Sequence, residues 1–131
     1  MQTTIAQKTL CFSDLKRKYP VLLDNAFYSA GKGWLPVIDD LCRSIHEHCD
    51  KFNVTLPHIK GFVDNFGELR IIYDTTDSYI KSVMDAASIR ARGLCEECGE
   101  DGKIHETYGR IVTVLCRKHE SLLQELQFIY N

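Results

Sequence analysis

The spacing of apolar residues predicts two helices in the first half of the chain. Ser13 and Asp14 are typical of a helix start, and Pro20 predicts that this short helix ends at Tyr19. A longer helix is predicted over 34–52, where apolar residues recur every three or four positions. These residues are Trp34, Val37, Ile38, Leu41, Ile45 and Phe52. Both segments therefore have an apolar face suited to a core.

The middle of the chain changes from helical spacing to an alternating pattern. Apolar residues over 59–63 and 69–73 flank a turn over 64–67, which predicts a β-hairpin. A third helix is predicted from a cap at 77–78 up to Gly93. The order of these elements predicts an α+β fold with helices packed on a β-hairpin.

Length and composition suit one globular unit. With 131 residues, the chain can form one compact core. We divide it into a helix-hairpin-helix region over 1–93 and a zinc-binding unit over 94–131, and we expect the two to pack as one compact domain. The formal net charge of -2 argues against a general nucleic-acid binder. We find no signal-peptide pattern and no long apolar run, so we expect a cytoplasmic protein.

The strongest chemical signal is a set of metal-ligand residues near the C-terminal end. Cys95 and Cys98 form a C-x2-C pair, and Cys116 and His119 form a C-x2-H pair after seventeen intervening residues. The spacing of the first pair lets both sulfurs turn toward one ion, and Gly99 permits the positive φ that such a zinc knuckle commonly needs. The sequence therefore predicts one zinc ion bound by these four residues.

The segments around the ligands predict a treble-clef-like unit of knuckle, hairpin and helix. Two short strands are expected over 103–115, with a reversal at Tyr108 and Gly109. Cys116 and His119 would lie in the first turn of a helix. Its apolar stripe would continue through Leu122, Leu123, Leu126 and Ile129. A zinc ribbon remains the alternative if the helix starts later.

Four protein ligands predict a structural role for the zinc. They fill a tetrahedral Zn²⁺ and leave no position for water or substrate. Structural zinc can contribute on the order of 10 kcal/mol, which is comparable with the stability of a small domain. We therefore expect the region 95–131 to lose its structure when the metal is removed.

Other cysteines and histidines are better explained without chemistry. A second metal site could be formed by Cys42, His46, His48 and Cys49. These residues border the apolar face of a predicted helix, however, where cysteine behaves as a small hydrophobe. Cys11 is likewise expected to be a buried thiol. His105 invites comparison with treble-clef nucleases, but their partner asparagine and second histidine are missing, so we interpret it as a hairpin surface residue.

Five short motifs together resemble a group of small bacterial and bacteriophage proteins. The group carries GW, LC, FGxLR, CExCG and LCxxH in this order, and the chain has Gly33-Trp34, Leu41-Cys42, 66–70, 95–99 and 115–119. The resemblance implies a bacterial or phage origin and a shared fold, and it supplies no activity. The chain departs from the group in having Val63-Asp64-Asn65 where a basic-acidic-basic triplet is usual, and Ile71 where an aromatic residue is usual.

These observations favour a non-catalytic, zinc-stabilised protein-interaction module of the inhibitor, immunity-protein or adaptor type. Arg70 and Tyr73 are the candidate partner-binding residues, since arginine and aromatic side chains anchor many interfaces. Pairing of Arg70 with an acidic neighbour is the structural alternative. The contact could be made by the hairpin Phe66–Tyr73 or by the zinc unit. A nucleic-acid-binding regulator is the alternative function. A metal-assisted hydrolase is less favoured, because no catalytic set appears.

Overall fold

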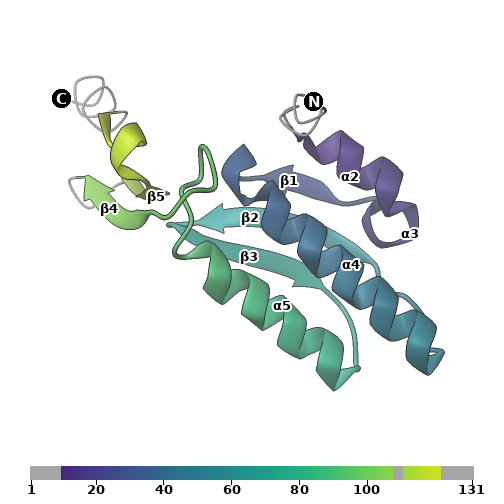
Figure 1. Ribbon diagram of the computed structural model, residues 1–131. Helices are drawn as coiled ribbons and strands as arrows, with labels where there is room; N and C mark the ends of the chain where they lie inside the picture. Colours follow the sequence, from purple (N-terminus) through teal and green to yellow (C-terminus); the bar gives the residue numbers. More distant parts are fainter. Residues whose placement is uncertain (1–9, 108–110, 122–131) are drawn as a thin grey trace, which may run out of the picture.

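A three-stranded sheet forms the centre of the fold, shown by a computed structural model that describes residues 10–107 and 111–121 (Figure 1). Strand β1 (Phe27–Ser29) runs parallel to β2 (Ile59–Asn65), which pairs antiparallel with β3 (Glu68–Tyr73). The predicted hairpin is confirmed as β2 and β3. Strand β1 was not predicted from the sequence, because three residues are too few to show a period.

Two long helices lie side by side on one face of this sheet (Figure 1). They are α4 (Leu35–Phe52) and α5 (Ser78–Ala91), as the apolar spacing predicted. Asp77 caps α5 by accepting a hydrogen bond from the backbone N–H of Ile80 at 3.0 Å. A short helical turn, η1 (Lys32–Trp34), leads into α4.

The N-terminal helices pack beside β1, and the first of them begins at a different residue from the one predicted. They are α2 (Phe12–Lys18) and α3 (Pro20–Leu23). The N-cap is Cys11, not Ser13, because the Asp14 carboxylate accepts from the backbone N–H of Cys11 at 3.2 Å and fixes the first turn there. Cys11 is exposed, so its prediction as a buried thiol is wrong.

The two faces of the sheet differ in how well they are covered. Phe62 and Leu69 are fully buried in the core shared with the helices, and the ring of Phe12 in α2 packs edge-on against Phe62. On the opposite face, Phe27 and Ile72 keep 49% and 37% of their surface exposed. The helices therefore cover one face and leave apolar side chains accessible on the other.

A second, two-stranded sheet lies at one end of the molecule (Figure 1). Its strands β4 (Lys103–Thr107) and β5 (Ile111–Leu115) are antiparallel, which confirms the predicted second hairpin. A short 3₁₀ turn, η2 (Arg117–His119), follows.

The second ligand pair is not on the regular helix that we predicted. Cys116 precedes η2 with an extended backbone, and His119 ends this turn. The predicted reversal at Tyr108–Gly109 and the predicted helix stripe lie outside the described residues; the stripe comprises Leu122, Leu123, Leu126 and Ile129. Within the described ranges, no helix has the length and apolar character needed to cross a membrane.

Candidate metal centre

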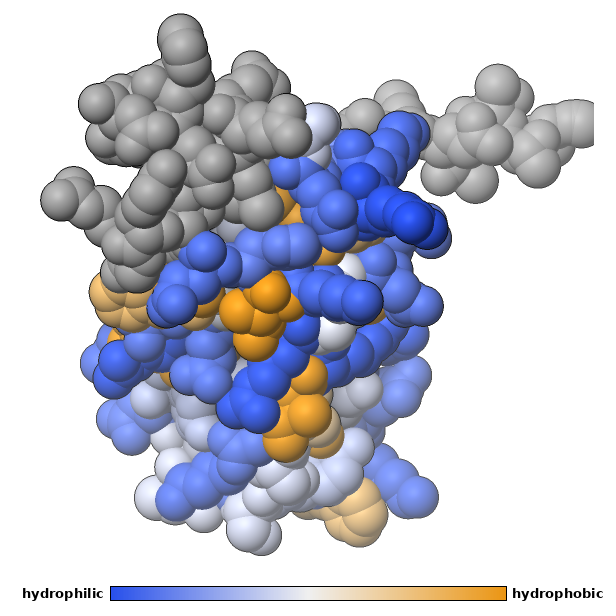
Figure 2. Space-filling model, turned by 90° about the vertical axis from the view of Figure 1, so that its left-hand side faces the viewer, coloured by the Kyte–Doolittle hydropathy of each residue, from blue (hydrophilic) through white to orange (hydrophobic). Residues whose placement is uncertain are grey.

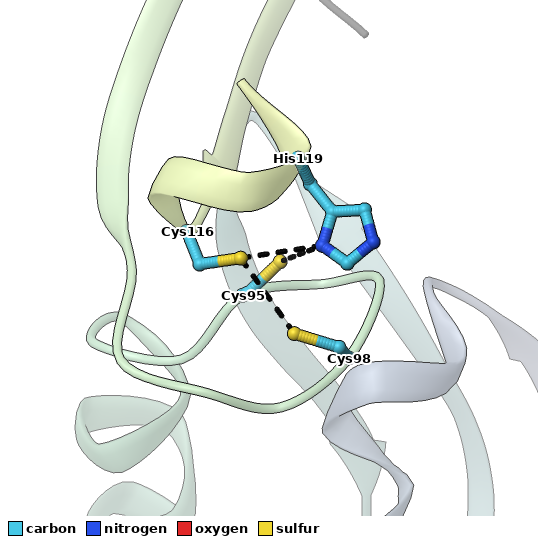
Figure 3. Close-up of side chains that lie close together, drawn as sticks. All are labelled: Cys95, Cys98, Cys116 and His119. Carbon is cyan, nitrogen blue, oxygen red and sulfur yellow. Dashed lines mark hydrogen bonds between the residues drawn. The ribbon is translucent and has the colours of Figure 1, made fainter. Parts of the chain in front are cut away.

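The loop after α5 folds as a knuckle around Cys95. The backbone N–H of Gly99 donates to the carbonyl of Cys95 at 2.8 Å, and the N–H of Cys95 donates to the carbonyl of Glu100 at 2.7 Å. Gly99 has a φ of 81°, a conformation that favours glycine. These bonds turn the chain so that the Cys95 and Cys98 side chains point to the same side (Figure 3).

The second pair of candidate ligands reaches the same point from β5 and η2. Figure 3 shows the Cys116 sulfur and the His119 ring nitrogen Nδ1 directed at the two knuckle sulfurs. The Cys116 sulfur lies 3.2 Å from His119 Nδ1 and 3.7 Å from the Cys98 sulfur. The Cys95 sulfur lies 3.6 Å from the same His119 nitrogen. All four donor atoms lie within 4.8 Å of one another.

These distances fit four donors around one tetrahedral ion. With a metal–sulfur bond of about 2.3 Å, two sulfurs of a tetrahedron lie about 3.8 Å apart, and a sulfur and an imidazole nitrogen lie about 3.5 Å apart. The observed separations are close to these values. The four residues predicted from the sequence can therefore hold a metal ion, and they form the one cluster of this kind in the described part of the chain.

The pKa values of Cys116 and Cys98 shift in opposite directions at this point. Burial raises the pKa of Cys116, but contacts with His119 and then Cys98 lower it more, so that it falls to about 6. The pKa of Cys98 is raised to about 11, chiefly by burial, with smaller contributions in the same direction from the Cys116 and Cys95 sulfurs and an opposing one from a backbone contact with Glu100. A metal ion would favour the deprotonated form of each thiol.

Two glycines let the first part of the chain lie directly against the knuckle. The N–H of Gly33 donates to the carbonyl of Glu96 at 2.7 Å. A Cβ atom on Gly33 would lie 2.1 Å from the carbonyl oxygen of Cys95, and one on Gly31 would lie 2.2 Å from that of Glu96. The Trp34 indole N–H also donates to the carbonyl of Leu94 at 2.9 Å. The Gly33-Trp34 motif is thus where the sheet region (residues 10–94) contacts the metal unit, which comprises the knuckle, β4, β5 and η2.

Glu96 is a buried residue beside the candidate ligands that was not predicted from the sequence. Its side chain is buried, and it accepts hydrogen bonds from the hydroxyl of Thr113 at 2.8 Å and from the backbone N–H of Val114 at 2.9 Å. Burial, and then the neighbouring Asp64 carboxylate, raise the pKa of Glu96 to about 8. Glu96 therefore ties the knuckle to β5. Its place between two cysteines was visible in the sequence, but its burial was not.

No second metal cluster is found around Cys42 and Cys49 in the described part of the chain. Cys42 and Cys49 are buried in the core, as predicted, and burial raises the pKa of Cys42 to about 12. His105 lies on the hairpin with its Nε2 atom 3.6 Å from a Glu120 carboxylate oxygen. Only 22% of the His105 side chain is exposed, so its prediction as a surface residue is wrong in part.

The structure places Arg70 and Tyr73 in one groove between β3 and α5. Both residues line this groove, whose volume is about 460 Å³. The predicted alternative, an ion pair of Arg70 with an acidic neighbour, is not found among the described residues. The neighbouring ion pair is instead between Arg92 and Glu68, at 2.8 Å.

The fold and this cluster define an α+β protein with a Cys₃His candidate metal centre. Comparisons with models of protein families, with curated proteins and with solved structures find no match. The function must therefore be inferred from the chain itself.

Proposed function

We propose that Cys95, Cys98, Cys116 and His119 bind one structural zinc ion, and that the zinc-stabilised protein is a non-catalytic protein-interaction module. The donor set carries the first part of this proposal. Thiolate sulfur and imidazole nitrogen are ligands that zinc prefers, and four of them fill a tetrahedral ion. The ion then has no open position for water or substrate. Its role is to hold the knuckle, β4–β5 and η2 together as a treble-clef-like unit.

The interaction part of the proposal is supported by the surface beside the first sheet. Arg70 has no ion-pair partner among the described residues and lies with Tyr73 along an open groove. Arginine and aromatic side chains are the residue types that most often anchor protein interfaces. The inhibitor, immunity-protein and adaptor roles all require a partner-binding surface, for which this groove is our candidate.

The groove is a better candidate contact than the end that carries the metal unit. Figure 2 shows that end of the molecule, where the described surface is mainly hydrophilic and apolar side chains form separate patches. Isolated apolar residues are normal on a protein surface and need no partner. We therefore place the contact at the hairpin side and assign the metal unit a stabilising role.

Elemental analysis of purified protein tests the zinc assignment. We expect one zinc per chain in the wild type and less than about 0.1 in Cys95→Ser, because the remaining donors leave the ion incompletely held. Cys11→Ser is the matched control, since Cys11 is exposed and far from the cluster in sequence, and it should retain one zinc. A second metal per chain, or none in the wild type, would contradict the assignment.

The interaction role is tested by reconstitution. The metal-replete protein is used to capture partners from a bacterial lysate, and each candidate is then purified and mixed with it. Sedimentation should give a complex of fixed stoichiometry. Salt-dependent binding to DNA or RNA without a protein partner would instead favour a nucleic-acid regulator. Catalytic turnover of a substrate would reject the non-catalytic role.

A further inference from the structure

Strand β3 forms an edge of the sheet with its backbone available for pairing. Among the described residues, the strand order β1-β2-β3 leaves one side of β3 without a neighbouring strand. The hairpin turn at Phe66 and Gly67 makes Asn65 and Glu68 the first hydrogen-bonded pair. Because such pairs alternate, the backbone N–H and C=O groups of alternate residues point away from β2. These residues are Leu69, Ile71 and Tyr73. Within the described part of the chain, no group hydrogen-bonds to them from that side.

The space beside this edge is a groove rather than open solvent. Residues 68–71, which are consecutive in β3, line it together with Tyr73, so the groove follows the strand edge itself. Its other wall is α5, which contributes Asp85 and Ser88. A strand added to a sheet lies about 4.8 Å from its neighbour and rises about 3.3 Å per residue. A segment of about six residues would therefore span β3, which is itself six residues long.

The charges along the groove have a defined order. At the hairpin end, Arg92 and Glu68 neutralise each other at 2.8 Å. Arg70 follows without an ion-pair partner among the described residues. Asp85 lies near Tyr73 at the other end of the groove. Burial is the main cause that raises the pKa of the Tyr73 phenol, and the charge of the Asp85 carboxylate raises it further. The two charges not used in ion pairs are thus of opposite sign and lie at different positions along the edge.

We propose that this groove binds an extended peptide segment of another protein, which adds to β3 as a fourth strand and places an acidic residue beside Arg70 and a basic residue beside Asp85. This inference rests on the proposed interaction function and specifies its mode. The unpaired backbone groups of β3 require an extended backbone as their complement, which a helix cannot offer because its own backbone groups are already paired. The two charges supply selectivity, because a strand of the wrong charge order would meet repulsion at both positions.

Selection from a peptide library tests the proposal even when the natural partner is not identified. The probe is a library of random linear peptides of about twelve residues, displayed on phage and selected against the zinc-loaded wild type. We expect enriched sequences to carry an acidic and a basic residue separated by a short extended spacer. Binding of a synthetic copy should slow hydrogen exchange at the amides of Leu69, Ile71 and Tyr73, as measured by NMR. Failure to enrich any peptide that protects these amides would overturn the proposal.

Methylation of alternate amides in the selected peptide provides an internal control. In an added strand, only every second N–H faces β3. Methylating one alternate set should weaken binding at least about tenfold, while methylating the other set should change it less than about threefold. Equal effects of the two sets would show that the peptide does not pair as a strand.

Two pairs of protein variants locate the peptide in the groove. Ser88→Trp narrows the groove and should weaken binding at least about tenfold, whereas Ser82→Trp on the exposed side of α5 should have little effect. Arg70→Glu should also weaken binding about tenfold, and a peptide with lysine in place of its acidic residue should restore it. Circular dichroism confirms that each variant is folded. Unchanged binding in Ser88→Trp would place the peptide elsewhere.

Failure of this inference is separable from failure of the interaction function. A purified protein complex that forms equally well with wild type and Ser88→Trp would keep the interaction role and reject the groove. Protection of the β3 amides through self-association, seen as a dimer by sedimentation without peptide, would also reject it, because the occupant would be a second copy of the chain.

Discussion

The sheet region and the metal unit are held together by different means. Over 10–94, the helices and the first sheet share a continuous core, in which Trp34, Ile38 and Phe62 are fully buried. In the described part of the metal unit, the separate buried cluster consists of Cys95, Leu115 and Cys116. Two of these three residues are candidate metal ligands. Apolar burial can stabilise the first region, but the second has little core without an ion.

The two regions nevertheless meet over a close contact. Val114 of β5 belongs to the buried core of the sheet region, and Gly33 hydrogen-bonds directly to the knuckle. The difference between the regions therefore predicts a hierarchy. Loss of the metal should unfold the metal unit first, and loss of core packing should destabilise the sheet region. A change at the junction should destabilise the contact between the two regions.

Metal removal should have the largest effect and should be confined to the metal unit. We expect a strong zinc chelator, or Cys95→Ser, to abolish slow hydrogen exchange over 95–121, because zinc binding contributes on the order of 10 kcal/mol to such units. Amides of α4 and α5 should retain their protection. NMR hydrogen exchange measures both in one experiment. Retained protection over 95–121 in the metal-free protein would show that the metal unit is stable without the ion.

A cavity in the core should destabilise the sheet region next most strongly. Phe62 is fully buried, and its ring packs against those of Phe12 and Tyr28. Phe62→Ala should lower the free energy of unfolding by about 3 to 5 kcal/mol, because it leaves a cavity among these rings. Urea denaturation measures the change.

The matched control is Phe52→Ala, since Phe52 is 60% exposed. Its effect should stay below about 0.5 kcal/mol. Under conditions where Phe62→Ala remains folded, it should still bind one zinc per chain. Loss of zinc from the folded variant would show that zinc binding by the metal unit depends on the packing of the sheet-region core.

The junction should show an intermediate effect in Gly33→Ala. The added Cβ would lie 2.1 Å from a backbone carbonyl oxygen, so the knuckle and η1 must separate, at a cost of about 1 to 3 kcal/mol. Gly93→Ala is the control, because its Cβ would meet no atom closer than 3.9 Å. Trp34 is the single tryptophan of the chain, and its indole donates to Leu94, so its fluorescence reports on this junction during denaturation. Equal stability of the two variants would show that the contact is dispensable.

The elements and ligands that could be predicted from the sequence are those whose signal is local. The helix over 35–52 and the hairpin over 59–73 have regular apolar periods, and the ligand spacing of 95–98 and 116–119 is itself the signature of a metal site. Each of these signals reflects one short stretch of chain.

The features that could not be predicted depend on contacts between distant segments. β1 is a strand because Phe27–Ser29 pairs with residues more than thirty positions later. Glu96 and Glu97 are indistinguishable in sequence, and only packing against β5 decides that Glu96 is buried. The groove beside β3 likewise arises from the placement of α5. Tertiary context, not local pattern, sets all three features.

The smallest effect should come from the exposed ion pairs of Asp40, one of which joins α4 to α5 through Arg90 while the other, with Arg43, lies within α4. Asp40 accepts from Arg90 and from Arg43, each at 2.8 Å, and these contacts lower the pKa of Asp40 despite partial burial. Because the folded pKa is below that of the unfolded chain, the stabilisation is present above about pH 4 and is lost as the pH falls through the folded value. Urea denaturation at pH 7 and pH 3 for the wild type and Asp40→Asn gives the difference, and an equal loss in the two would show that Asp40 does not hold the helices together.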